Sequence, residues 1–217
     1  MNLEATSTSK PSFLEELRIQ RWDDHRFYHQ SRVNQSLHFV SACSFVAAYV
    51  MLAAGRPIEA ALLGWLVSMA TRQSGHFFFE PRGFDHVNQA TDEHKEAIKV
   101  GYNIQRKVIL IAAWAATPVA LFYDRTLFGL FEPREGFAGY LWNLSVLWIW
   151  LGVIAVFLRT AFLSITRDPR TGIVWATKIL TDPFHDILLY WKSPLALLRG
   201  EWIDPMDDVK ARQNTPG

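Results

Sequence analysis

The histidines are the residues of this 217-residue chain that best fit a shared chemistry. Neutral imidazole nitrogen binds iron, zinc, copper and nickel, so histidines that meet in space predict a metal site. We take six of the seven histidines as candidate ligands and give less weight to the seventh, His185. The six are His25, His29, His38, His76, His86 and His94.

Two pairs of these histidines have helical spacing. His25 and His29 are four residues apart, which places both rings on one face of a helix. His86 and His94 are eight residues apart, or two helical turns along one face. Asp85 precedes His86 and is a further candidate, as a ligand or as a partner of a ligand. Each pair could therefore contribute to one metal site.

The other two candidate ligands lie inside apolar stretches. An imidazole buried at His38 or His76 is costly unless it is hydrogen-bonded or binds a metal. Glu80 follows His76 by four residues, so its carboxylate could bind the metal or orient the ring. Asn34 and Gln73 flank the two histidines and are candidate hydrogen-bond partners for them. These polar groups favour a site near the ends of two antiparallel helices.

Four apolar stretches must position these residues: 33–55, 60–79, 106–123 and 140–160. A bilayer core of about 30 Å requires roughly 20 apolar residues in a helix. A soluble bundle of buried helices is the alternative, but the last stretch shows no polar face. The pattern therefore predicts an all-α, integral membrane four-helix bundle, forming a single domain over residues 1–217.

Basic residues orient this bundle. Arginine and lysine are frequent before the first apolar stretch, between the second and third, and after the fourth, and scarce in the other two loops. The positive-inside rule places both termini in the cytoplasm, whether the membrane is a bacterial inner membrane or the endoplasmic reticulum. We expect no cleaved signal peptide, because no basic segment followed by an apolar one begins the chain. All the candidate ligands then lie on or near the cytoplasmic face.

Two amphipathic segments are predicted to lie along that face. Residues 12–31 mix apolar and charged side chains, with Ser12 as the predicted N-cap of a helix. Residues 173–199 form a second helical segment, which prolines interrupt and in which Thr181-Asp182-Pro183 has the pattern of a helix start. Residues 203–217 are predicted to be a loose tail.

Charge and cysteine content exclude several classes of protein. The net charge is +1, so no basic surface indicates nucleic-acid binding. Cys43 is the single cysteine, which rules out an internal disulfide and a cysteine-based zinc cage.

The histidine motifs resemble those of the membrane family of the fungal 2-hydroxy fatty acid dioxygenase. The resemblance covers roughly residues 22–85 and agrees with a count of four helices. The matching residues are Tyr28-His29, Asn34, His38, Gln73-Ser74-Gly75-His76 and Phe79-Glu80. After Glu80 the sequence departs from the family pattern.

The resemblance implies an Fe(II)-dependent enzyme that uses O2 to shorten a 2-hydroxy fatty acid by one carbon. The cofactor would be one or two iron ions, and the partners would be O2, a fatty-acyl or related lipid substrate, and membrane lipids. Arg72 or Arg82 would then pair with the substrate carboxylate, or simply mark the membrane boundary.

Two other functions fit the same residues. A membrane di-iron lipid hydroxylase or desaturase also uses histidines on the cytoplasmic face of a four-helix core, although no two adjacent histidines occur here. A non-catalytic metal-binding membrane protein or transporter is the second alternative. Two iron ions per chain would favour the hydroxylase, and one would favour the dioxygenase.

Overall fold

The computed structural model describes residues 10–98 and 104–213, and in these residues the predicted all-α class is confirmed. Within these described residues the structure has no β-strand. The helices are α1 (Phe13–Tyr28), α2 (Arg32–Ala53), α3 (Pro57–Ala61), the π-helical segment η1 (Leu62–Met69), α4 (Ala70–Phe78), α5 (Asp92–Ile98), α6 (Ile104–Tyr123), α7 (Gly136–Thr166), α8 (Pro169–Tyr190), α9 (Ser193–Leu198) and α10 (Asp207–Gln213).

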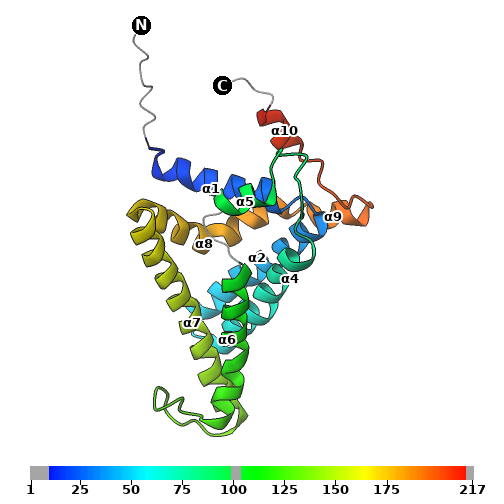
Figure 1. Ribbon diagram of the computed structural model, residues 1–217. Helices are drawn as coiled ribbons and strands as arrows, with labels where there is room; N and C mark the ends of the chain where they lie inside the picture. The colour runs from blue at the N-terminus through cyan, green and yellow to red at the C-terminus, as the bar shows by residue number, and fades with distance from the viewer. Residues whose placement is uncertain (1–9, 99–103, 214–217) are drawn as a thin grey trace.

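The helices separate into two groups (Figure 1). Helices α1, α5, α8, α9 and α10 gather at one end of the molecule, and α6 and α7 extend to the opposite end, where the loop between them lies. Helix α8 packs against α7, α2 and α1, so it covers the end of the long helices. This covered end is where the candidate ligands must be sought.

Helices α2 and α7 are long and apolar enough to cross a membrane. A core helix of a soluble protein is mostly buried, but only 11% of the most apolar 18 residues of α7 are buried. Large apolar side chains remain exposed along it, among them Trp150, Phe157 and Phe162. The apolar part of α6, Val108–Tyr123, is shorter. The second predicted span, 60–79, is divided among α3, η1 and α4.

The π-helical segment η1 packs against α2 through small residues. Gly64 and Ser68 are buried, and Ser68 Oγ donates a hydrogen bond to the backbone oxygen of Ser41 at 2.8 Å. The two serine hydroxyls also lie 2.8 Å apart, so each has a polar partner in an apolar surrounding. This contact holds η1 against α2, which carries His38. Because η1 continues directly into α4, it also positions the helix that carries His76.

One of the two predicted helix starts is correct in detail and the other is wrong. Ser12 caps α1 as predicted: its Oγ accepts from the backbone N–H of Glu15 at 3.3 Å, and the Glu15 carboxylate accepts in return. Asp168 and Pro169 begin α8, and the helix runs through Pro183 without a break. The helix start predicted at Thr181-Asp182-Pro183 is therefore wrong. Packing of α8 on three other helices outweighs the cost of one internal proline, about 3 kcal/mol.

Two further expectations about local structure are also corrected. Residues 85–90 form a loop closed by the bridge between Asp85 and Ala90, so His86 and His94 do not lie on one helix. The C-terminal residues 203–213 are ordered against the rest of the chain, because Met206 and Val209 are fully buried. Residues 214–217 lie outside the described residues.

Replacing Gly172 with alanine is expected to destabilise the crossing of α7 and α8. An added Cβ would lie 2.1 Å from Ser164 Oγ and 2.7 Å from the backbone oxygen of Thr160, so the helices must separate. Overpacking of this kind costs about 1–3 kcal/mol. Gly64→Ala is the matched control, since its nearest neighbours lie 3.8 Å away. Equal thermal unfolding temperatures for the two variants in detergent would contradict this account of the crossing.

Candidate metal centre

Three of the predicted ligands converge at the end of the molecule covered by α8. His29 follows the last residue of α1, His38 lies in the second turn of α2, and His76 lies near the end of α4. One ring nitrogen of each lies within 4.8 Å of the others, and the Nε2 atoms of His29 and His38 are 3.1 Å apart. Metal–nitrogen bonds of about 2.1 Å place neighbouring ligand nitrogens roughly 3.0–3.4 Å apart. The spacing therefore suits a single ion after a small contraction.

The opposite nitrogen of each ring faces a group that can orient it. His29 Nδ1 donates to the backbone oxygen of Asp24 at 2.7 Å, and His76 Nδ1 donates to Glu80 Oε2 at 2.8 Å. His38 Nδ1 lies 3.6 Å from Asp186 Oδ2. Histidines that bind metals typically donate their second ring N–H to a carbonyl or carboxylate, which leaves the other nitrogen unprotonated for the metal. Hydrogen bonding thus assigns Nε2 of His29 and His76 to the centre, and His38 Nε2 faces Nε2 of His29.

Close approach of α2 and α4 depends on Gly75. An added Cβ at Gly75 would lie 2.2 Å from Asn34 Oδ1 and 3.6 Å from His38 Cδ2. Asn34 is fully buried, and its Nδ2 donates to the backbone oxygen of Tyr28 at 2.7 Å. Asn34 therefore ties the end of α1 to α2 and sets the path of the chain into His29. Gln73 makes no hydrogen bond to the three histidines in the described part of the chain.

Helix α8 supplies the other side of the site with residues that the sequence interpretation did not select. Lys178, Asp182, Asp186 and Tyr190 are four residues apart in succession, so they lie along one face of α8. All four are buried. The ring of Tyr190 lies 5.5 Å from that of His29, centroid to centroid. The regular spacing of these polar residues by four could have identified this face from the sequence. The sequence interpretation expected a helix break at Pro183 and therefore did not place the four residues on one helix.

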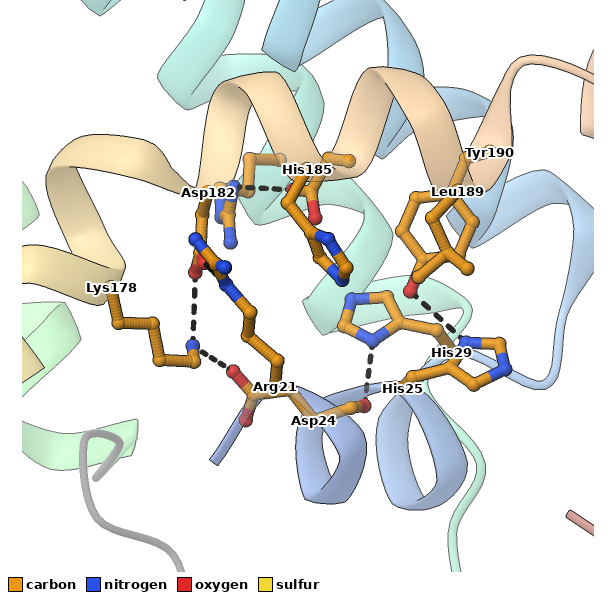
Figure 2. Close-up of a pocket in the computed structure, with 11 residues that line it drawn as sticks. Arg21, Asp24, His25, His29, Lys178, Asp182, His185, Leu189 and Tyr190 are labelled. Carbon is orange, nitrogen blue, oxygen red and sulfur yellow. Dashed lines mark hydrogen bonds and ion pairs between the residues drawn. The ribbon is translucent and has the colours of Figure 1, made fainter. Parts of the chain in front are cut away.

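Charged side chains from α1, α4 and α8 pair with one another beside the histidines (Figure 2). Lys178 Nζ contacts the carboxylates of Asp24 and Asp182, and Arg21 Nε donates to Asp182 at 3.1 Å. Arg72 Nη1 donates to Asp186 at 3.1 Å. The pairs surround a cavity of about 10 Å³, which is room for about one water molecule. Each charge in this network is compensated by a neighbour.

The remaining predicted site residues lie at different distances from this centre. Arg72 lies within it, beside Asp186, whereas Arg82 is exposed and donates to the backbone oxygen of Phe77 at 3.0 Å. Asp85 is buried, but it accepts hydrogen bonds from the backbone of its own loop and from Gln30.

The other four histidines are not in the three-histidine cluster. His25 lies next to it, with Nδ1 3.3 Å from Tyr190 Oη and Nε2 3.3 Å from Asp208 Oδ2. His185 lines the small cavity. His86 lies in the loop that precedes α5, and His94 lies in α5. Both side chains are exposed, and neither belongs to the three-histidine cluster. The structure thus brings together half of the six predicted ligands.

Burial keeps two of these imidazoles neutral. Removal from water lowers the pKa of His29 well below its ordinary value of 6.5, and the neighbouring His38 lowers it further, although Asp186 and Asp24 oppose the shift. Burial also lowers the pKa of His25, despite the opposing charge of Asp208. A neutral ring is the form that binds a metal.

We expect the metal-free protein to lose stability as the pH falls below about 6.5. The unfolded chain binds protons at His25 and His29 from pH 6.5 downward, while the folded chain resists doing so until its lowered pKa values are reached. Stability is therefore complete above pH 6.5 and declines toward pH 5. Thermal unfolding between pH 7.5 and 5 measures this effect. A His25→Gln, His29→Gln double variant should show a flatter pH dependence, and an unchanged slope would contradict the assignment.

Comparison of the chain with protein-family models, with curated proteins and with solved structures finds no match.

Proposed function

We propose that this protein is a membrane-bound, iron-dependent dioxygenase that shortens 2-hydroxy fatty acids by one carbon. The observation that carries the proposal is the set of three converging imidazoles, each with Nδ1 facing an oxygen that can orient it. The set lies where apolar helices meet a layer of polar helices. The motifs that contain these histidines are also those that resemble the dioxygenase family.

The apolar surfaces support a membrane location for the long helices. We infer that α2, the α3–η1–α4 segment, α6 and α7 form the four-helix membrane bundle, with both termini in the cytoplasm. Exposed apolar residues along α2, α6 and α7 would contact lipid, among them Val50, Val119, Phe122, Val153 and Phe157. Helices α1 and α8 would lie at the cytoplasmic surface. A fatty acid could then keep its acyl chain in the bilayer while its polar end reaches the histidines.

The donor set fits a ferrous ion, although imidazole alone does not select iron over zinc, copper or nickel. His29, His38 and His76 would hold the ion, and three protein ligands leave coordination positions open. When bound, Fe(II) would supply the redox chemistry that activates O2. Asp24 and Glu80 hold two of the rings in orientation, and Asp186 faces the third.

The proposed reaction balances without an external reductant. A 2-hydroxy carboxylate and O2 give the shortened carboxylate, CO2 and water. The bond between Cα and the carboxylate breaks, and the substrate loses four electrons, which reduce one O2 completely. The hydrogens of the hydroxyl group and of Cα end in water. Arg72 is the cation beside the centre that could pair with the substrate carboxylate, in exchange for part of its contact with Asp186.

The described residues contain one three-histidine cluster, which favours one ion over two. Among the other predicted ligands, His86 and His94 are exposed, and both ring nitrogens of His25 face Tyr190 and Asp208. The three-histidine set therefore supports the dioxygenase over a di-iron hydroxylase. A non-catalytic metal-binding protein would share the cluster and differ only in lacking turnover.

Metal analysis and a product assay together test the proposal. The protein is purified in detergent, loaded anaerobically with Fe(II), and exposed to O2 with 2-hydroxyhexadecanoate. We expect one iron per chain and formation of pentadecanoate, with hexadecanoate unreactive as the matched substrate control. Two irons per chain would instead favour the hydroxylase. Tight metal binding without any product would favour the non-catalytic alternative and overturn the proposal.

A further inference from the structure

Polar contacts lead from Tyr190, whose ring lies beside the candidate metal centre, to the surface. Tyr190 Oη lies 3.3 Å from His25 Nδ1, and His25 Nε2 lies 3.3 Å from Asp208 Oδ2. The two contacts use both nitrogens of the His25 ring. Figure 2 shows Tyr190 on α8 above His25 on α1. Residues from α1, α8 and α10 are thus joined through one imidazole.

These contacts connect a buried end to an exposed end. Tyr190 is 2% exposed and lines the small cavity, and its ring packs against those of His29 and His38. His25 is also buried, at 6% exposure. The Asp208 side chain, in contrast, is 53% exposed. The contacts therefore cross the polar layer that separates the three histidines from water.

The protonation states of these groups agree with one direction of hydrogen bonding. A tyrosine hydroxyl carries one hydrogen, so the Tyr190 hydroxyl can donate to His25 Nδ1 when that nitrogen is unprotonated. Burial lowers the pKa of His25, and the charge of Arg32 lowers it further. The carboxylates of Asp208 and Asp204 oppose this shift. A neutral His25 that accepts at Nδ1 must carry its proton on Nε2, which faces the Asp208 carboxylate.

We propose that Tyr190, His25 and Asp208 form a proton-transfer path between the metal centre and solvent. This inference rests on the proposed function, in which the substrate hydroxyl group loses a proton and water forms later. As a proton reaches the Tyr190 oxygen from the site, the phenol proton passes to His25 Nδ1 and the Nε2 proton passes to Asp208. When water forms, the same transfers run in reverse and deliver a proton from Asp208 back to the site. The complete reaction therefore neither consumes nor releases protons.

A set of variants tests the path by turnover. Tyr190→Phe keeps the ring packing and removes the hydroxyl, and Asp208→Asn removes the terminal acceptor. We expect kcat to fall about 10-fold or more in each, with KM and iron content unchanged. In His25→Ala, added imidazoles should restore turnover in proportion to their basicity, which simple filling of the space would not produce. His94→Ala is the exposed control and should keep full activity.

Nitrogen NMR of ring-labelled histidine tests the same path without turnover. In metal-free protein, His25 should show the tautomer protonated at Nε2. Tyr190→Phe should shift the Nδ1 resonance, and Asp208→Asn should shift that of Nε2. Protonation at Nδ1, or rescue that is independent of imidazole basicity, would overturn the path. If the unaltered protein forms no product, the proposed function fails by itself, while the NMR result still decides whether the three groups are linked as described.

Discussion

His38→Ala should lower the affinity of the protein for Fe(II) by at least about 100-fold. Loss of a residue that only orients a metal ligand costs about 10- to 100-fold in affinity, and loss of a ligand itself should cost more. His38 is fully buried, and its Nε2 lies 3.1 Å from that of His29, so it is central to the cluster. Equilibrium binding with a competing chelator measures the affinity.

Two companion variants separate metal binding from folding. His38→Gln retains a polar side chain of similar length, so helical content and thermal unfolding should remain close to those of the unaltered protein while metal binding is lost. His94→Ala removes an exposed histidine and should leave the affinity unchanged. Full iron binding by a folded His38→Gln protein would exclude the three-histidine centre.

Lys178→Met should destabilise the protein by up to about 3–5 kcal/mol, because it removes the buried cation that pairs with the partly exposed Asp24 and the buried Asp182. Asp182 keeps Arg21 as a partner, whereas Asp24 loses the cation it contacts. Burial acts to lower the pKa of Lys178, but the charges of Asp24 and Asp182 outweigh it and the pKa is raised above the ordinary value. The ammonium is therefore retained at all pH values near neutrality. For a chain of this size the expected loss corresponds to a fall in unfolding temperature of roughly 6–20 °C.

A double variant tests whether charge pairing is the cause. In Lys178→Met with Asp24→Asn, the carboxylate that loses its cation is also removed, so part of the lost stability should return. The backbone oxygen of Asp24 that holds His29 is unaffected by this change. Lys192→Ala, at an exposed position, is the control and should cost little. A double variant no more stable than Lys178→Met alone would argue against the pairing.

The amino-acid sequence alone determined the helical class and much of the donor set. Apolar stretches of about 20 residues are typical of long helices, so the positions of α2 and α7 follow from composition. His38 and His76 were identified because a polar ring inside an apolar stretch needs a partner. The four-residue spacing of His76 and Glu80 predicted a contact that the structure contains, at 2.8 Å.

Other features were decided only by tertiary structure. His25 and His29 share a helical spacing, but α1 ends at Tyr28, so His29 turns to the centre while His25 faces Tyr190 and Asp208. Local spacing cannot show where a helix ends relative to its neighbours, nor whether a loop histidine such as His86 reaches a site. Lys178, Asp186 and Tyr190 became recognisable once packing carried α8 through Pro183. Contacts between segments more than 100 residues apart form only when whole helices pack against one another. A local sequence pattern does not specify which two helix surfaces will meet.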